Sequence, residues 1–291
     1  MPNFYHLCGI SGSGKTTYAY NHSQENDVIL DSDSIREELW GNAADQQQPD
    51  KVFEEMFRRT ITAFKEGRNV YYCSTGLSAR HRINLLKQLR RKFDFEAKCI
   101  ICIAPVEICK ERNSSRDRVV PEYVIERQVR SFQVPLFNEG WQTIQIVHTA
   151  PTDYMQIRRT LWSQVENFGS QNNSHHTLSL LEHCLRCESL TLQIPGMLPR
   201  ALDEAACWHD VGKLYTQEYW PEKDNEAHYP GHAQYGAYLM LCMGFSILAA
   251  QLVCYHMDLY NPQLFVKGAE RYGDELWDLL LKLHQCDVEA H

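Results

Sequence analysis

The feature that most constrains this 291-residue chain is a short glycine-containing segment near its start. Residues 9–16 read Gly-Ile-Ser-Gly-Ser-Gly-Lys-Thr, which has the spacing Gly-x-x-x-x-Gly-Lys-Thr. The apolar run Phe4–Cys8 precedes this segment, and a helix is expected to begin at Lys15. A strand, a glycine-containing turn and a helix in this order predict a loop whose backbone amides bind phosphate.

Each part of this loop has an expected role in binding a nucleoside triphosphate and magnesium. The glycines let successive N–H groups converge on the β-phosphate, and the Lys15 ammonium lies near the β- and γ-phosphate oxygens. The Thr16 hydroxyl is expected to bind Mg²⁺, and Lys15 is also a candidate catalytic residue. The residues expected to bind ATP are Gly9, Ser11, Gly12, Ser13, Gly14, Lys15, Thr16 and Thr17.

The first half of the chain alternates short apolar runs with amphipathic segments. Apolar residues recur at helical spacing between Asp50 and Glu66, and residues 80–92 and 121–132 also have helical patterns. Strands separated by helices predict a parallel sheet flanked by helices. The runs expected to form buried strands are Phe4–Cys8, Val28–Leu30, Val70–Cys73, Cys99–Ile103 and Ile144–Val147.

The second half has a different pattern and a different charge. Residues 152–165 are expected to form a closing helix, and the polar, turn-forming stretch 167–174 follows it. We therefore expect an α/β domain over residues 1–168 and an all-α domain over residues 169–291. Residues 1–168 hold 22 Lys and Arg against 21 Asp and Glu, whereas the remainder holds 7 against 16, so most of the net charge of −8 lies in the second half.

Composition limits the cellular setting. No apolar stretch approaches the roughly 20 residues that span a bilayer, and the first residues lack the pattern of a signal peptide. Several of the eleven cysteines, among them Cys8, Cys73, Cys99 and Cys102, lie in apolar runs, as buried thiols would. We therefore expect a cytoplasmic protein without a membrane partner.

Charged residues after the second and fourth expected strands are candidates for phosphoryl transfer. Asp33 and Arg36 lie one helical turn apart, so the carboxylate can accept a hydroxyl proton while the arginine binds an acceptor phosphate. The alternative makes Asp33 a helix N-cap and Arg36 a solvated side chain. Arg112 and Arg116, with Arg118, are expected to close over the triphosphate, unless this segment is an ordinary exposed loop. Arg80 and Arg82 are weaker candidates and are expected on an exposed helix face.

These features resemble the P-loop kinases of the polynucleotide 5′-kinase type over about residues 1–166. The resemblance implies that Asp33 is the general base, that Arg36 contacts the acceptor phosphate, and that Arg112 and Arg116 clamp ATP. Related kinases often have Asp-x-Thr-Asn after the third strand, where this chain has Cys73-Ser74-Thr75-Gly76. A contact to the acceptor or to Mg²⁺ is therefore expected to differ.

The second half contains a series of metal-ligating residue types. Imidazole nitrogens and carboxylate oxygens together suit divalent zinc, manganese, iron, nickel or cobalt. An isolated His-Asp pair is common at helix ends, but a series of six such residues favours a metal site. The candidate ligands are His183, His209, Asp210, His232, His256 and Asp287.

Residues 174–288 resemble the HD-superfamily phosphohydrolases. The motif consists of Glu182-His183-Cys184, the run His209–Lys213, Gly231-His232, His256 and Cys286-Asp287. The stretch 172–178, which includes His175 and His176, together with 228–232, looks like the HD module of bacterial tRNA nucleotidyltransferases. The resemblance implies a central metal set of His183, His209, Asp210 and Asp287. His232 and His256 would bind a second metal or the substrate phosphate, and Lys213 would stabilise phosphate charge.

Together the two resemblances predict a P-loop kinase domain fused to an HD domain. The leading hypothesis is RNA end healing, in which a 5′-hydroxyl kinase and a 2′,3′-phosphate hydrolase prepare RNA ends, tRNA fragments among the candidates, for a separate ligase. A second hypothesis is a small-molecule kinase fused to a nucleotide phosphohydrolase. A third treats the HD half as a nucleotide-sensing module that regulates the kinase.

Overall fold

The computed structural model describes residues 1–45, 47–174, 177–222 and 226–290. His175 and His176 lie outside these described residues. The chain divides into two compact units, Met1–Gln128 with Pro135–Pro151, and Val129–Val134 with Thr152–His291. Helix α7 (Tyr154–Phe168), expected in the first domain, packs against helices of the second unit. The first unit therefore ends at Pro151 rather than at residue 168.

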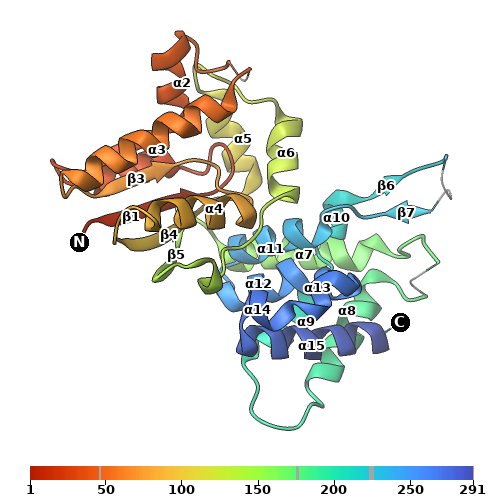
Figure 1. Ribbon diagram of the computed structural model, residues 1–291. Helices are drawn as coiled ribbons and strands as arrows, with labels where there is room; N and C mark the ends of the chain where they lie inside the picture. The colour runs from red at the N-terminus through yellow and green to blue at the C-terminus, as the bar shows by residue number, and fades with distance from the viewer. Residues whose placement is uncertain (46, 175–176, 223–225, 291) are drawn as a thin grey trace. The chain divides into compact units, whose positions relative to one another are not determined.

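The first unit is built on a five-stranded parallel sheet with the strand order β2-β3-β1-β4-β5 (Figure 1). All five expected strands are present, and β4 begins three residues earlier than its apolar run. The parallel sheet flanked by helices is therefore confirmed for this part of the chain. The strands are β1 (Asn3–Cys8), β2 (Val28–Asp31), β3 (Val70–Cys73), β4 (Glu96–Ile103) and β5 (Thr143–His148).

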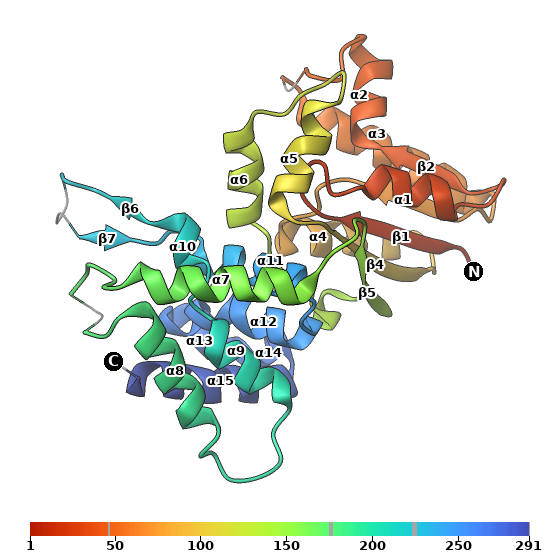
Figure 2. The same ribbon diagram turned by 180° about the vertical axis from the view of Figure 1, so that it is seen from behind.

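Helices cover both faces of this sheet, because side chains alternate between faces along each buried strand. Leu7 packs in one apolar cluster with Ala19 of α1 (Lys15–His22), whereas Phe4 packs edge to face on Phe64 of α3 (Pro49–Lys65). Figure 2 shows α1 in front of the sheet. The other helical segments are α2 (Ser32–Trp40), α4 (Ala79–Arg90), α5 (Val106–Ser114), α6 (Glu122–Arg130) and the 3-10 turn η1 (Phe137–Glu139).

Arg82 on α4 departs from expectation, since its side chain is only 1% exposed. Its guanidinium forms two hydrogen bonds with Glu139, of 2.6 and 2.7 Å, and the Trp141 indole donates to the same carboxylate. A buried charge of this kind needs a partner from elsewhere in the fold, which the α4 sequence does not reveal. Arg80 is exposed, as expected.

The second unit is helical apart from one short hairpin. The all-α expectation missed β6 (Glu218–Tyr219) and β7 (Ala227–His228), because two-residue strands leave no periodic pattern to detect. No helix in the described part of the chain is both long and apolar enough to cross a bilayer. Besides α7, the helices are α8 (Leu180–Thr191), α9 (Arg200–Trp208), α10 (Lys213–Thr216), α11 (His232–Cys242), α12 (Ile247–Tyr255), the 3-10 helix η2 (His256–Tyr260), α13 (Pro262–Val266), α14 (Gly268–Tyr272) and α15 (Asp274–Glu289).

Candidate functional site

Residues 9–17, called the loop site below, connect β1 to α1. Gly12 has φ +82°, and a Cβ at this position would lie 2.1 Å from the Cys109 carbonyl oxygen, so only glycine fits. Gly14, also at φ +82°, is the N-cap of α1, which begins at Lys15 as expected. The N-terminus of α1 and the preceding turn therefore present backbone N–H groups suited to an anion.

The charged and polar groups of the loop site are held close to its backbone. The Lys15 ammonium donates to the carbonyl oxygens of Gly9 and Ile10 at 2.9 and 2.8 Å. Burial lowers the pKa of Lys15, and the nearby charge of Arg116 acts in the same direction. The Ser11 amide donates to Gln128 Oε1 of α6 at 2.7 Å, a contact that no sequence pattern indicated. Ser13 is buried, whereas Thr17 lies exposed on α1.

Asp31 is a candidate site residue to which the sequence reasoning gave no role. The Thr16 hydroxyl donates to its Oδ2 at 2.8 Å, and its Oδ1 accepts from the amides of Asp33 and Ser34. Asp31 is therefore the N-cap of α2, and it joins that helix to the loop site. A hydroxyl and a carboxylate side by side suit Mg²⁺. The position of Asp31 at the carboxyl end of β2, at the same edge of the parallel sheet as the loop, was the available signal.

Asp33 and Arg36 face each other on α2, and the alternative that Asp33 is the N-cap is wrong because Asp31 occupies that position. Arg36 is buried, and its Nη1 lies 2.6 Å from Asp33 Oδ1 and 3.3 Å from the Ala43 carbonyl oxygen. Arg118 also pairs with Asp33 Oδ1. The half-exposed Asp33 carboxylate therefore lies between two guanidinium groups, one of them from the segment after α5.

Two further arginines, Arg112 and Arg116, precede Arg118 in the chain. Arg112 contacts a residue beside the loop site, and Arg116 is exposed. Arg112 lies on α5 and donates to the Thr149 carbonyl oxygen at 2.8 Å, while the Thr149 hydroxyl donates to the Ser13 carbonyl oxygen. Arg116 follows the helix, and its charge acts on Lys15. The Cys73–Gly76 segment borders the loop as well, since the Gly9 amide donates to the Thr75 carbonyl oxygen at 3.0 Å.

The second unit brings all six expected ligands together in what we call the His/Asp site. They come from α8, the end of α9, the start of α11, the end of α12 and α15, and each is at most 8% exposed. His183 Nε2 and His209 Nε2 are 3.0 Å apart and lie 3.1 and 3.3 Å from Asp287 Oδ1. Residues far apart in the sequence therefore point their donor atoms at one place.

Asp210 lies between two groups of donor atoms. Its Oδ2 is 3.5 Å from both His183 Nε2 and His209 Nε2. Its Oδ1 is 3.3 Å from His232 Nε2 and 3.9 Å from His256 Nε2. One carboxylate therefore joins two three-residue groups, each compact enough to hold an ion.

Backbone carbonyls orient three of these imidazoles. The Nδ1 atoms of His209, His232 and His256 lie 2.8, 2.8 and 2.7 Å from the carbonyl oxygens of Ala206, Tyr229 and Val253. A proton on Nδ1 for these bonds leaves the Nε2 lone pair directed into the site. Tyr260, which the sequence analysis did not single out, donates to Asp287 Oδ2 at 2.9 Å.

The electrostatics of the His/Asp site favour bound positive charge. Although burial opposes it, Lys213 and then His209 hold the pKa of Asp210 well below its usual range, and His209 does the same for Asp287. Burial alone would lower the pKa of His209, but Asp210 and Asp287 raise it to about 9. Burial, with the charges of His209 and His232, lowers the pKa of His256 to about 3.

Lys213 lies inside this site rather than at its edge. Its ammonium contacts Asp210 Oδ2 and Gln171 Oε1, both at 2.6 Å, and its side chain is buried. Once an ion displaces the proton of His209, two carboxylates and one ammonium leave a net negative charge among neutral imidazoles. The donor types, their orientation and this charge together fit one or two divalent transition-metal ions.

Residues 5–135 match a family model described as the AAA domain. With the glycine loop and the parallel sheet, this part of the chain is a P-loop kinase-like, nucleotide-binding domain. Its fold is consistent with ATP and Mg²⁺ as ligands. The matched segment ends before the His/Asp site. A search of curated proteins found no match to this chain.

Proposed function

We propose that this chain is a bifunctional RNA end-healing enzyme. Its first unit would be an ATP-dependent 5′-hydroxyl polynucleotide kinase, and its second an HD-type metal-dependent 2′,3′-phosphate phosphohydrolase. The observation that carries the proposal is the presence, in one chain, of a P-loop and of a buried cluster of six side chains suited to metal ions. The loop site suits a nucleoside triphosphate, and the His/Asp site gathers six donor side chains around Asp210.

For the kinase reaction, the loop amides and Lys15 would hold the β- and γ-phosphates of ATP. Asp33 would accept the proton of the RNA 5′-hydroxyl as its oxygen bonds to the γ-phosphorus, while the bond from that phosphorus to the β–γ bridging oxygen breaks. Arg36, whose Nη1 lies 2.6 Å from Asp33 Oδ1, would bind an RNA phosphate. Arg112 and Arg116 would neutralise charge on the transferred group.

For the hydrolase reaction, His183, His209, Asp210 and Asp287 would hold one ion, and Asp210, His232 and His256 a second. A divalent ion bound there supplies a Lewis acid and a water of lowered pKa. The chain's own contribution is to orient these ligands through the backbone carbonyls at Nδ1 and to exclude bulk water from the buried donors. Lys213 keeps Asp210 ionised and adds positive charge for a phosphate.

The pairing of these reactions has a chemical rationale. Ribonucleases that leave a 2′,3′-cyclic phosphate also leave a 5′-hydroxyl, and neither end suits a ligase that needs a 5′-phosphate and a 3′-hydroxyl. One chain with both activities corrects both ends of a break. A separate RNA ligase would then act, and fragments of tRNA in the cytoplasm are candidate substrates.

Two observations favour a second candidate, a small-molecule kinase fused to a nucleotide phosphohydrolase. The segment Cys73–Gly76 replaces the Asp-x-Thr-Asn that polynucleotide kinases often carry, and the net charge of −8 disfavours non-specific binding of nucleic acid. A third reading, in which the His/Asp site only senses nucleotides, predicts no turnover there.

The deciding experiment measures both reactions on the same preparation. The chain is incubated with γ-labelled ATP and either a 5′-hydroxyl oligoribonucleotide or a panel of nucleosides, and separately with Mn²⁺ and an oligoribonucleotide ending in a 2′,3′-cyclic phosphate. End healing predicts label on the oligonucleotide and phosphate loss from the cyclic end. Label on nucleosides alone would favour the metabolic kinase, and an unchanged cyclic end would remove the hydrolase half.

A further inference from the structure

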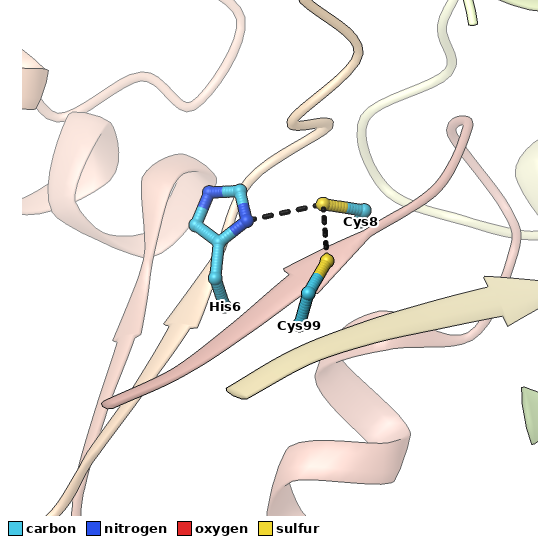
Figure 3. A group of neighbouring side chains, drawn as sticks. All are labelled: His6, Cys8 and Cys99. Atoms are coloured by element: carbon cyan, nitrogen blue, oxygen red, sulfur yellow. Dashed lines mark hydrogen bonds between the residues drawn. The ribbon is translucent and has the colours of Figure 1, made fainter. Parts of the chain in front are cut away.

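A second group of metal-ligating side chains lies in the first unit, within the sheet itself (Figure 3). His6 and Cys8 lie two residues apart on β1, and Cys99 pairs with His6 in register on β4. His6 and Cys8 alternate with Leu7, which packs with Ala19 of α1, so they face the opposite side of the sheet. The neighbouring strands therefore place two thiols and one imidazole on the same face.

The three ligand atoms are close together and buried. His6 Nδ1 lies 3.0 Å from Cys8 Sγ, which lies 3.5 Å from Cys99 Sγ, and all three atoms are within 4.8 Å of one another. His6 is 2% exposed and both cysteines are fully buried. The group is therefore screened from solvent and compact enough for a single ion.

The surroundings fix the imidazole, and the backbone passes close beside it. The His6 ring stacks on Tyr72 and Trp141, and its second nitrogen, Nε2, lies 3.4 Å from the Ser74 hydroxyl. An Nε2 proton donated to Ser74 leaves the Nδ1 lone pair directed at the two sulfurs. A Cβ at Gly76 would lie 2.6 Å from His6 Cε1 and 2.7 Å from Cys8 Sγ, so only glycine allows the backbone to pass this close to the two ligands.

We propose that His6, Cys8 and Cys99 form a binding site for a thiophilic divalent cation of the zinc class. Zinc binds thiolate sulfur at about 2.3 Å and imidazole nitrogen at about 2.1 Å. With those bond lengths, the 3.5 Å between the two sulfurs corresponds to an S–ion–S angle of roughly 100°. The 3.0 Å between His6 Nδ1 and Cys8 Sγ corresponds to an N–ion–S angle of roughly 85°. Small outward shifts of the side chains bring both angles to the tetrahedral value.

The charge balance of the site also supports a divalent cation of this class. Two thiolates and a neutral imidazole cancel the two charges of the ion, so the complex is neutral and suits a buried position. In the His/Asp site, two of the four side chains His183, His209, Asp210 and Asp287 are carboxylates. The group in the sheet instead offers sulfur, which selects softer ions. Three ligands are one fewer than in closed zinc sites, so binding is expected to be weaker than in those sites.

The position of the site predicts its effect. Cys8 directly precedes Gly9, the first residue of the loop site, and the ion would join β1 to β4 beneath that loop. Bound metal should raise the thermal unfolding temperature of the first unit, because it binds only the folded chain. This inference does not depend on the proposed RNA chemistry.

The test is a titration of the reduced, full-length chain with Cd²⁺, a zinc-class probe, after saturation with Mn²⁺ to occupy nitrogen and oxygen sites. Thiolate-to-cadmium charge transfer absorbs in the ultraviolet and reports sulfur ligands alone. We expect the band to saturate at about one ion per chain, in accord with one three-residue group. Cys8→Ser and Cys99→Ser should reduce it to background, whereas Cys73→Ser and Cys102→Ser, buried cysteines on the same sheet, should retain it.

Absence of the band in the unsubstituted chain, or a full band in Cys8→Ser and Cys99→Ser, would overturn the proposal. A second measurement needs no variant and so does not depend on whether a substituted chain folds. In moderate urea, where transient opening of the sheet exposes these buried thiols, Cd²⁺ should slow the alkylation of Cys8 and Cys99 by at least about tenfold while leaving the labelling rate of Cys207 unchanged, because only bound sulfur loses its nucleophilicity. Equal labelling rates of Cys8 with and without Cd²⁺, under conditions where Cys8 is labelled, would likewise refute the site.

Discussion

The loop site and the His/Asp site bring their binding groups together in opposite ways. The loop site uses nine consecutive residues, and its binding groups are mainly backbone amides held by glycines and a helix start. The His/Asp site uses side chains spread from residue 183 to residue 287, and five helices bring them together. A backbone site therefore depends on local conformation, whereas a side-chain site depends on packing and on each individual ligand.

Asp210→Ala should give the largest effect, because this carboxylate contributes to both donor groups. We expect phosphate release from a 2′,3′-cyclic end to fall by at least roughly 10³-fold, since both ions lose a ligand. Kinase activity of the same preparation is the control for folding, and Asp210→Asn is the matched variant that keeps the side-chain volume. Substantial hydrolysis by Asp210→Ala would show that the two donor groups do not act through this residue.

Lys15→Ala should give the next largest effect, and it should affect the kinase reaction rather than the hydrolysis. The loss of one charge over the β- and γ-phosphates should lower phosphoryl transfer by roughly 10²–10³-fold, as for other groups that stabilise transition-state charge. Hydrolysis of the cyclic end should be unchanged. If Lys15→Ala disables both reactions in a folded chain, the two sites do not act independently.

Gly12→Ala tests whether the loop site depends on backbone conformation. The new methyl group would meet the Cys109 carbonyl oxygen and force a left-handed residue into strain, so ATP affinity should fall by about 10- to 100-fold. Gly41→Ala is the control, because Gly41 also has positive φ but no atom of the described residues lies within 4 Å of its added Cβ. Isothermal titration with ATP measures both variants, and equal losses would contradict the steric account.

The pH dependence of metal binding should give the smallest effect. Metal binding needs neutral His209, whose pKa is raised to about 9 in the metal-free chain. As the pH falls from 8 to 7, protonation of His209 competes with the ion, so Mn²⁺ affinity should decrease by about tenfold. Calorimetry in buffers of different ionisation enthalpy should detect proton release on binding, and a flat profile would argue that His209 is not a ligand.

Much of the first unit was predictable because buried strands and amphipathic helices leave short-range patterns. All five strands and the start of α1 followed from apolar runs and glycine spacing. The exposed position expected for Arg82 was wrong, since its partner Glu139 is distant in the sequence. The expected helical ranges did not include α5, whose last turn contains Arg112.

The candidate sites were predictable as sets of residues but not as arrangements. The sequence identified Asp33 and Arg36, whereas the fold added Arg118 to the same carboxylate and assigned the helix cap to Asp31. Nothing in local spacing indicated that Gln128 contacts the loop. The Arg118 and Gln128 contacts join elements that are distant along the chain.

By itself, the sequence determined the glycine loop, the alternation of strands and helices, and the identity of the six His/Asp residues. Only the tertiary structure decided that Asp210 joins two donor groups and that His6, Cys8 and Cys99 converge within the sheet. The physical reason is the distance along the sequence over which each feature is determined. Backbone conformation follows from neighbouring residues, whereas the meeting of distant side chains follows from strand register and helix packing.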